Sequence, residues 1–299
     1  MSITAYLREI GRGRDGARAL DPSQAKDLMG QLLDGTVSDL AVGAFCAAMR
    51  IKGETPDEMG GFLDALHERL PPWPCTVPTV VIPSYNGARR LPVLTPLLAG
   101  LLAREGLAVL MHGTPTEDRR VGSASVLHAL HWPVLAAPRA VAAGEVAFMP
   151  TEHWHTGLHR LLQVRRQVGL RNSAHSLVKL LQPLNGPALL VSSYTHPEYA
   201  IAMADTLSRR GTRAVLLRGL EGEPVADPRR QPAIDAFVHG QRHTLVAAQT
   251  GPLTDLPSLP SDVQAEATAA YTAAVLAGTL PVPAPIAAQV RAVVHSFHL

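Results

Sequence analysis

Residues 81–113 read VIPSYNGARRLPVLTPLLAGLLAREGLAVLMHG and contain an apolar strand, a loop, an apolar helix and a second strand. This order is typical of a site for a nucleotide or a sugar phosphate, in which backbone N–H groups at a helix N-terminus hold phosphate. The loop, however, has one glycine, Gly87, no acidic residue, and two arginines, Arg89 and Arg90. The stretch predicts an α/β unit and raises the question of whether its loop still binds phosphate.

The alternation of strands and helices continues towards the C-terminus. Strands are expected near residues 78–82, 107–111, 188–193, 213–217 and 243–248, and helices near 92–104, 122–130, 155–169, 173–182, 197–210 and 261–277. Such alternation indicates a mainly parallel sheet with helices on both faces. The predicted fold class is therefore α/β.

Residues 2–70 are expected to form short helices instead. Asp21 is placed to cap one helix with Pro22 at its first position, Ser38 to cap the next, and Thr55 to open a third. The prolines of PPWPC, residues 71–75, forbid helix continuation and mark a boundary. The helices expected in 151–184 interrupt the alternation and are expected to pack back on the first ones. The predicted domains are a small discontinuous helical domain, residues 1–72 with 151–184, and a larger α/β domain, residues 77–150 with 185–299.

Composition excludes several classes of protein. No uninterrupted apolar run approaches the ~18 residues of a membrane span, and no apolar segment follows a basic start as in a secretory signal. Two cysteines, Cys46 and Cys75, are too few for a disulfide framework and favour a reducing, cytoplasmic location. Neither cysteine is expected to act as a nucleophile.

The net charge of +2 conceals an uneven distribution of charged residues. Residues 1–80 hold 8 basic and 11 acidic residues, whereas residues 150–213 hold 8 basic and 3 acidic residues. A local excess of positive charge raises the surface potential and attracts polyanions. Solvated helix faces have the same composition, so the excess alone does not distinguish a binding surface from an ordinary one.

Four motifs carry a family resemblance. They are AAMRIKGETPDEMGGF at 47–62, MHG at 111–113, GSASVLHALHWP at 122–133 and VGLRNSAHSLVKLLQPLNGP at 168–187. Their order and spacing resemble anthranilate phosphoribosyltransferase over nearly the whole chain. The resemblance implies a helical domain beside an α/β domain, an active site between the two, and a homodimer formed through the helical domain.

Three departures from that family concern one ligand site. A Gly-Thr-Gly-Gly-Asp loop that wraps the pyrophosphate of phosphoribosyl pyrophosphate is replaced by residues 84–90, SYNGARR. The lysine of Lys-His-Gly is replaced by Met111, and an Asp-Glu pair that holds Mg²⁺ is replaced by Glu221-Gly222-Glu223-Pro224, with its carboxylates separated. Fewer glycines hinder close backbone approach to a pyrophosphate. Loss of phosphoribosyl transfer is therefore expected, and Mg²⁺ is expected as a cofactor only if the transferase alternative holds.

The patterns SYNGARR, LRNSAHSL and GLEGEP are similar to the YbiB-type branch of the family. That resemblance implies the transferase fold without evident transferase activity, and sequence-independent binding of nucleic acid. The first hypothesis is therefore a non-catalytic homodimer that binds DNA or RNA. The alternative is an enzyme, a pentosyl transferase that acts on an aromatic amine or base with a rebuilt phosphate loop.

Basic residues are the candidates for contacts with nucleic acid. Guanidinium groups suit phosphate and carboxylate alike, and the resemblance implies that an arginine near helix 155–169 helps to hold the anthranilate carboxylate. On a polymer, such groups would follow successive phosphates along the inter-domain cleft. The candidates are Arg89, Arg90, Arg119, Arg120, Arg160, Arg165, Arg166, Arg171 and Lys179. The competing interpretation is helix-surface charge paired with Glu152 or Asp205.

A phosphate or substrate site is the second candidate. Its residues would be Asn86, Gly87, His112, Gly113, Ser123 and Arg171. Ser123 and Ser125 begin an expected helix, where they suit phosphate binding and helix capping equally.

The third candidate is a metal site. The pattern H-x-H-x3-H at His153, His155 and His159 suggests zinc, since His155 and His159 share a helix face. No cysteine, and no carboxylate other than Glu152, completes the set. Partly exposed histidines are the preferred interpretation, and neither a metal site nor a catalytic residue is predicted.

Overall fold

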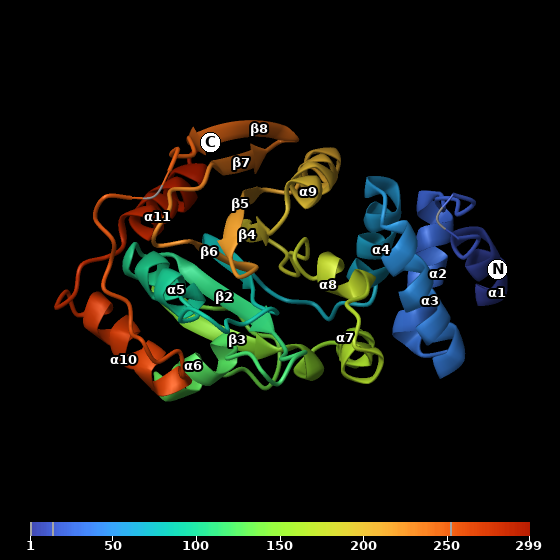
Figure 1. Ribbon diagram of the computed structural model, residues 1–299, viewed down its shortest axis with the longest axis horizontal. Helices are drawn as coiled ribbons and strands as arrows, with labels where there is room; N and C mark the ends of the chain where they lie inside the picture. Colours follow the sequence, from blue (N-terminus) through green and yellow to red (C-terminus); the bar gives the residue numbers. More distant parts are fainter. Residues whose placement is uncertain (1, 14, 252) are drawn as a thin grey trace.

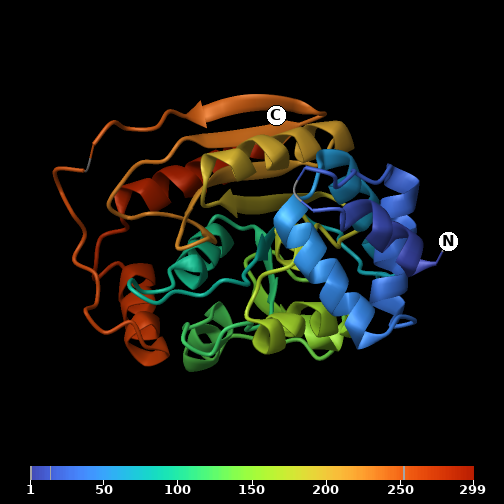
Figure 2. The ribbon, with the colours of Figure 1, turned by 45° about the vertical axis from the view of Figure 1, so that its right-hand side comes forward.

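The computed structural model describes residues 2–13, 15–251 and 253–299. A helical bundle stands at one end of an α/β unit, and α10 (Ala265–Leu276) lies at the other end (Figures 1 and 2). The bundle consists of α1 (Ile3–Ile10), α2 (Pro22–Asp34), α3 (Asp39–Lys52) and α4 (Pro56–His67). Three predicted helix starts are confirmed, because side chains of Asp21, Ser38 and Thr55 accept backbone N–H groups of the first turns of α2, α3 and α4.

One sheet runs through the α/β unit in the order β3-β2-β1-β4-β5-β7-β8, with β6 paired to β5. Its strands are β1 (Thr79–Pro83), β2 (Ala108–Gly113), β3 (Val146–Pro150), β4 (Ala188–Tyr194), β5 (Ala214–Leu220), β6 (Glu223–Ala226), β7 (Ile234–Val238) and β8 (Gln241–Val246). The strands from β3 to β5 are parallel, whereas β6, β7 and β8 pair antiparallel. The sheet is therefore mainly parallel, as predicted.

Alternate residues of each central strand face opposite sides of the sheet. Val80 and Ile82 pack in one apolar cluster with α5 (Thr95–Arg104) and α11 (Ala284–Ser296), whereas Val81 packs in another with α9 (Pro197–Arg210). The second cluster continues without a break into the helical bundle. Burial on both faces explains why these strands are continuous apolar runs in the sequence.

Several elements were not predicted or were predicted with wrong bounds. The strands β3, β6 and β7 and the helix α11 were missed, and the helix expected over 173–182 ends earlier, as α8 (Ser173–Leu177). The short α6 (Ser123–Ala129) lies near its expected place. Two of the missed strands begin or end at hairpin turns in which Glu221 and His239 have positive φ angles of 50° and 52°. Positive φ is uncommon for residues other than glycine, so the sequence did not indicate hairpin turns at these two positions.

The segment between β3 and β4 contacts the helical bundle, where Figure 1 shows it beside the blue helices. The helix α7 (Thr156–Val168) touches α2 and α3, and α8 touches α3 and α4. The division into domains at these joints stays a prediction. None of the described helices is long and apolar enough to cross a membrane.

Candidate functional site

The carboxyl ends of the parallel strands bring the predicted substrate residues to one edge of the sheet. Asn86, Gly87 and Ser123 line a cavity of about 80 Å³ there, between the loop after β1 and the start of α6. Gly113 packs so tightly against this loop that an added Cβ would lie 2.0 Å from the carbonyl oxygen of Ser84. Ser123 does not cap α6 with its side chain, and its hydroxyl instead hydrogen-bonds that of Ser84 at 2.7 Å.

A carboxylate fills the place where the loop would hold a phosphate. Glu223, 1% exposed, accepts the backbone N–H groups of Asn86 and Gly87 on Oε1, both at 2.8 Å. Its Oε2 accepts the hydroxyls of Ser84 and Thr95. Four donors converge on one buried side chain, as they converge on a bound anion in other proteins.

A second carboxylate completes the arrangement. Glu221 accepts the backbone N–H groups of Arg89 at 2.8 Å, Arg90 at 2.9 Å and Leu91 at 3.2 Å. Within the loop, the N–H group of Ala88 donates to the carbonyl of Val121 at 2.9 Å. Every backbone N–H group from residue 86 to residue 91 is thus bonded inside the protein.

A tight turn aims the two carboxylates at the loop. Glu221 and Gly222, both with positive φ, form a two-residue turn between β5 and β6, since Leu220 pairs with Glu223. A Cβ at Gly222 would lie 2.1 Å from Asn86 Nδ2, which donates to the Gly222 carbonyl. The sequence Glu-Gly-Glu therefore separates its carboxylates so that both reach the loop; we name the assembly of Glu221 and Glu223 with residues 84–91 the closed loop.

His112 lies behind the closed loop and has no solvent exposure. Its Nδ1 hydrogen-bonds the Tyr85 hydroxyl at 2.8 Å, and burial lowers the pKa of its imidazole to about 3. The ring is therefore neutral near pH 7 and supports the loop from within. The predicted role of His112 in contacting a substrate is not favoured by this position.

Three of the predicted arginines are already paired with acidic side chains. Arg165 donates to Glu117 at 2.5 Å, and Arg120 donates to the same carboxylate at 3.0 Å. Arg166 forms an ion pair with Asp118. The sequence interpretation had considered Glu152 and Asp205 as partners, but the partners of these three lie in the 117–118 segment.

Other predicted basic residues divide into two groups. The side chains of Arg89, Arg90 and Arg119 are exposed and have no partner in the described part of the chain. In contrast, Arg160 donates to the Leu32 carbonyl at 2.8 Å, at the C-terminal end of α2. That contact directs the Arg160 guanidinium to the bundle, which argues against its predicted place on a phosphate track.

Lys179 is also engaged internally. Its Nζ donates to the carbonyls of Ser193 at 3.0 Å and Gly222 at 2.9 Å, and burial lowers its pKa to about 8. It thus connects the end of β4 to the turn of the closed loop. A direct phosphate contact, as predicted, would require Lys179 to leave these two carbonyls.

Arg171 also has no partner in the described part of the chain, but unlike Arg89, Arg90 and Arg119 it is partly buried. It lines a cavity of about 390 Å³ between α4, α8 and α9, together with Arg50 and His175, two residues that the sequence interpretation missed. Burial, followed by the nearby charges of Arg165 and Arg120, lowers the pKa of Arg171 to about 10. Arg50 lies just before Gly53-Glu54-Thr55, in one of the motifs that carry the family resemblance. Its place in that motif is the signal from which the sequence could have predicted it. We name this space the basic cavity.

The three histidines of the possible zinc pattern have separate partners. His153 Nδ1 contacts the Leu135 carbonyl at 2.9 Å, and buried His155 accepts the backbone N–H of Leu158 at 3.1 Å, where it caps α7. His159 Nδ1 lies 3.3 Å from Glu152. Among the described residues, no three His, Cys, Asp or Glu side chains are grouped to hold a metal ion.

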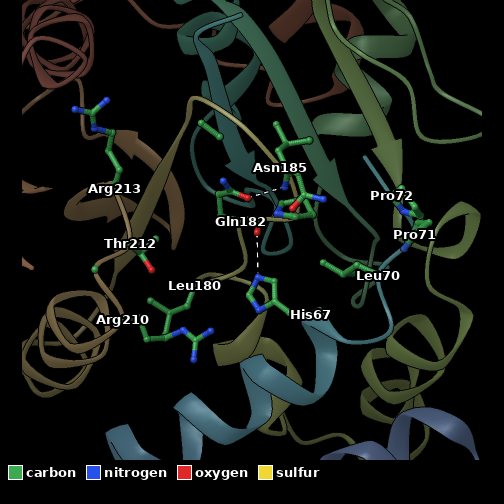
Figure 3. Close-up of a pocket in the computed structure, with 14 residues that line it drawn as sticks. His67, Leu70, Pro71, Pro72, Leu180, Gln182, Asn185, Arg210, Thr212 and Arg213 are labelled. Carbon is green, nitrogen blue, oxygen red and sulfur yellow. Dashed lines mark hydrogen bonds between the residues drawn. The ribbon is translucent and has the colours of Figure 1, made fainter. Parts of the chain in front are cut away.

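A further cavity, of about 500 Å³, lies at the opposite edge of the sheet (Figure 3). It is bounded by the two connections between bundle and sheet, residues 70–72 and 182–185, and His67 Nε2 contacts the Gln182 carbonyl at 3.1 Å. Its other wall precedes β5, at Thr212 and Arg213. Ligands of open α/β sheets bind at the carboxyl ends of the strands. This cavity lies at the amino ends of the strands, so it is not the candidate site.

Comparison with known proteins agrees with this architecture. A model described as the helical bundle domain of a glycosyl transferase family matches residues 4–70. The chain is 38% identical over 280 residues to the uncharacterized protein YbiB of Escherichia coli (strain K12), covering 91% of this chain and 87% of YbiB. It is 30% identical over 213 residues to anthranilate phosphoribosyltransferase of Synechococcus sp. (strain JA-3-3Ab), covering 69% of this chain and 62% of that enzyme. The chain belongs to the anthranilate phosphoribosyltransferase-like family.

Solved structures of the family share the fold. The crystal structure of anthranilate phosphoribosyltransferase from Thermus thermophilus superposes with a TM-score of 0.72 at 23% identity, covering 98% of this chain and 87% of that one. The enzyme from Saccharomyces cerevisiae, in complex with PRPP and Mg, gives a TM-score of 0.67 at 14% identity, covering 96% of this chain and 85% of that one. At these identities the likeness establishes the fold, a helical domain with a mainly parallel α/β domain.

Proposed function

We propose that this chain is a non-catalytic member of its family that binds nucleic acid without sequence specificity, along the basic surface between bundle and sheet. One observation carries the proposal: Glu223 occupies the anion-binding groups of the loop, while Arg50 and Arg171, which line the basic cavity, have no partners among the described residues. The donors of the loop are therefore taken, whereas these two guanidinium groups remain available for a phosphate from outside.

The closed loop supports the non-catalytic part of the proposal. Phosphoribosyl pyrophosphate needs donors for its pyrophosphate and oxygen ligands for Mg²⁺. Here Glu221 and Glu223, the carboxylates in the place of the metal-binding pair, accept hydrogen bonds from the loop instead. The remaining cavity of about 80 Å³ is well below the ~300 Å³ at which small-molecule pockets usually begin.

The free cations support nucleic acid as the partner. Exposed guanidinium groups contact phosphates of any sequence, and the release of counterions supplies most of the affinity. Arg89, Arg90 and Arg119 extend the unpaired charge from the closed loop outward. DNA and RNA share this backbone chemistry, so the proposal covers both.

A homodimer is part of the proposal. Leu40 and Ile51 are 85% and 65% exposed on α3, on an outer face of the bundle. Symmetric association would bury such a face and join two basic surfaces, which gives longer nucleic acids an advantage over short ones. The buried free thiols of Cys46 and Cys75 fit a cytoplasmic protein.

Fluorescence anisotropy with labelled oligonucleotides across a salt series tests the proposal. We expect sequence-independent binding whose affinity falls with salt, with a log–log slope of roughly −0.7 per phosphate contacted on a single strand. The absence of binding even at low salt would sink the proposal. In parallel, the protein is incubated with phosphoribosyl pyrophosphate, Mg²⁺ and anthranilate. Turnover at ~1 s⁻¹ or faster would support the alternative, a pentosyl transferase.

A further inference from the structure

The basic cavity has the size and position of a ligand site. Its volume of about 390 Å³ lies within the ~300–1,000 Å³ of small-molecule pockets. It opens at the carboxyl end of β4, next to Ser193, and Lys179 separates it from the closed loop. It therefore lies on the path that the proposed phosphate track follows.

One wall of the basic cavity is cationic. Neither Arg50 nor Arg171 has a hydrogen bond or an ion pair within residues 2–13, 15–251 and 253–299. Glu54 also lines the cavity, and burial raises the pKa of its carboxyl. The exposed Glu198 is the other acidic residue that lines the space. An anion of the ligand is therefore best placed at the two guanidinium groups.

Other residues that line the basic cavity are aromatic and apolar. Tyr199, 39% exposed on the first turn of α9, lies beside His196, with ring centroids 6.3 Å apart. Met59 and Met203 form the apolar surface farther in. Aromatic rings and thioethers pack well on flat, polarizable ring systems. A ligand with one flat ring and one neighbouring phosphate suits both sets of side chains.

We infer that an unpaired base of a single-stranded nucleic acid occupies the basic cavity, with its ring against Tyr199 and its phosphate at Arg50 and Arg171. This inference rests on the proposed function and deepens it by naming the form of nucleic acid. A base within a duplex is stacked and paired, and must be unstacked before it enters such a pocket. The protein therefore binds single strands more tightly than duplexes of equal charge.

The test compares Tyr199→Ala with Ile201→Ala, a control truncation on the same helix at a side chain that is 74% exposed. Anisotropy is measured with a thymidine homo-oligomer, with an oligomer of equal length made of abasic sites, and with a duplex hairpin. Removal of one base–aromatic contact typically weakens binding roughly 5- to 150-fold. We expect Tyr199→Ala to weaken thymidine binding within that range and to leave duplex and abasic binding unchanged. Tyr199→Phe and Ile201→Ala should both behave as the parent protein.

Several outcomes would overturn the inference while leaving the proposed function intact. They are equal parent affinity for single strand and duplex, equal weakening of both by Tyr199→Ala, and no effect of Tyr199→Ala on the thymidine oligomer. If the parent binds none of the three probes at low salt, the proposed function fails and the inference fails with it. Melting curves of each variant confirm that a loss of affinity is measured on folded protein.

Discussion

The closed loop and the basic cavity lie at the same edge of one sheet, yet their charges are balanced in opposite ways. In the closed loop, Glu221 and Glu223 satisfy five backbone N–H groups and two hydroxyls from inside the protein. In the basic cavity, Arg50 and Arg171 have no partner in the part of the chain that the structure describes. The comparison teaches that loop donors are satisfied when the protein supplies its own anion, which is the basis of the proposed loss of phosphate binding there. In the basic cavity, by contrast, our proposal is that the anion comes from outside.

The largest expected effect is on the closed loop itself. Replacing Glu223 by alanine leaves four buried donors without their acceptor, and each unsatisfied group costs ~1–3 kcal/mol. We expect the free energy of unfolding to fall by about 3 kcal/mol or more, measured by urea or thermal unfolding. The exposed Glu105→Ala serves as control and should stay within ~0.5 kcal/mol. A Glu223→Ala protein as stable as the parent would contradict the structural importance of the carboxylate.

The next effect is on the basic cavity. Replacing Arg50 and Arg171 together by alanine should reduce the salt-dependence slope by about 1.4, from two lost phosphate contacts on a single strand. If variant and parent have the same affinity when extrapolated to 1 M salt, this change of slope makes the variant bind roughly 25-fold more weakly than the parent at 0.1 M salt.

The matched control is Arg165→Ala with Arg166→Ala. If both arginines contacted phosphates, as the sequence predicts, their replacement would lower the slope by about one to two units. The ion pairs with Glu117 and Asp118 now predict a smaller change, because nucleic acid must compete with two carboxylates. If the paired arginines matter more than the free ones, the comparison between the two regions is wrong.

One buried histidine in each of the two regions makes the stability of the protein depend on pH. Burial lowers the pKa of His112, behind the closed loop, and of His175, in the basic cavity, to about 3 each. The unfolded chain binds these protons near pH 6.5, so stability is retained above that pH and is lost as the pH falls towards 3. Each histidine contributes at most ~1.4 kcal/mol per pH unit. Urea unfolding of His112→Gln and His175→Gln between pH 4.5 and 7 should show a flatter dependence than the parent, and an unchanged dependence would contradict their neutral state.

The smallest expected effect is the binding of pyrophosphate to the closed loop after Glu223 has been removed. In Glu223→Ala, pyrophosphate should occupy the freed donors and raise the melting temperature, whereas the parent should not respond. At a ligand concentration equal to Kd the gain is only ~0.4 kcal/mol, about a degree or less, with sodium chloride of equal ionic strength as control. A parent protein stabilised as much as the variant would show that Glu223 does not block the site.

Much of the fold follows from local pattern. The caps of α2, α3 and α4 and the apolar strands β1, β2, β4 and β5 were predicted within a few residues, because caps and continuous apolar runs are local properties. The antiparallel end of the sheet was not, since β6 and β7 depend on turns with positive φ at Glu221 and His239. The helix α11 follows closely spaced prolines and has Pro285 in its own first turn, and no element was predicted there.

The residues of the candidate site were predictable from the sequence, but the hydrogen bonds and ion pairs that these residues form were not. The sequence indicated that residues 84–90 lack the glycines of a pyrophosphate loop, and that the acidic pair is split by Gly222. It did not indicate that the split carboxylates reach across 128 to 139 residues to close the loop. Nor did it separate the paired Arg165 from the unpaired Arg171.

The sequence by itself determined most of the helices and the strands β1, β2, β4 and β5, the apolar character of these elements, and which ligand groups of the family are missing. Those properties depend on neighbours along the chain, through hydrogen bonds of a few residues' span and the periods of helix and strand. Only the tertiary structure decided which charges cancel, because electrostatic pairing depends on distance in space. Glu223 lies 2.8 Å from the N–H groups of Asn86 and Gly87, while Arg171 lies among other cations. That difference in distance satisfies the donors of the closed loop inside the protein and leaves the Arg171 guanidinium without an internal partner.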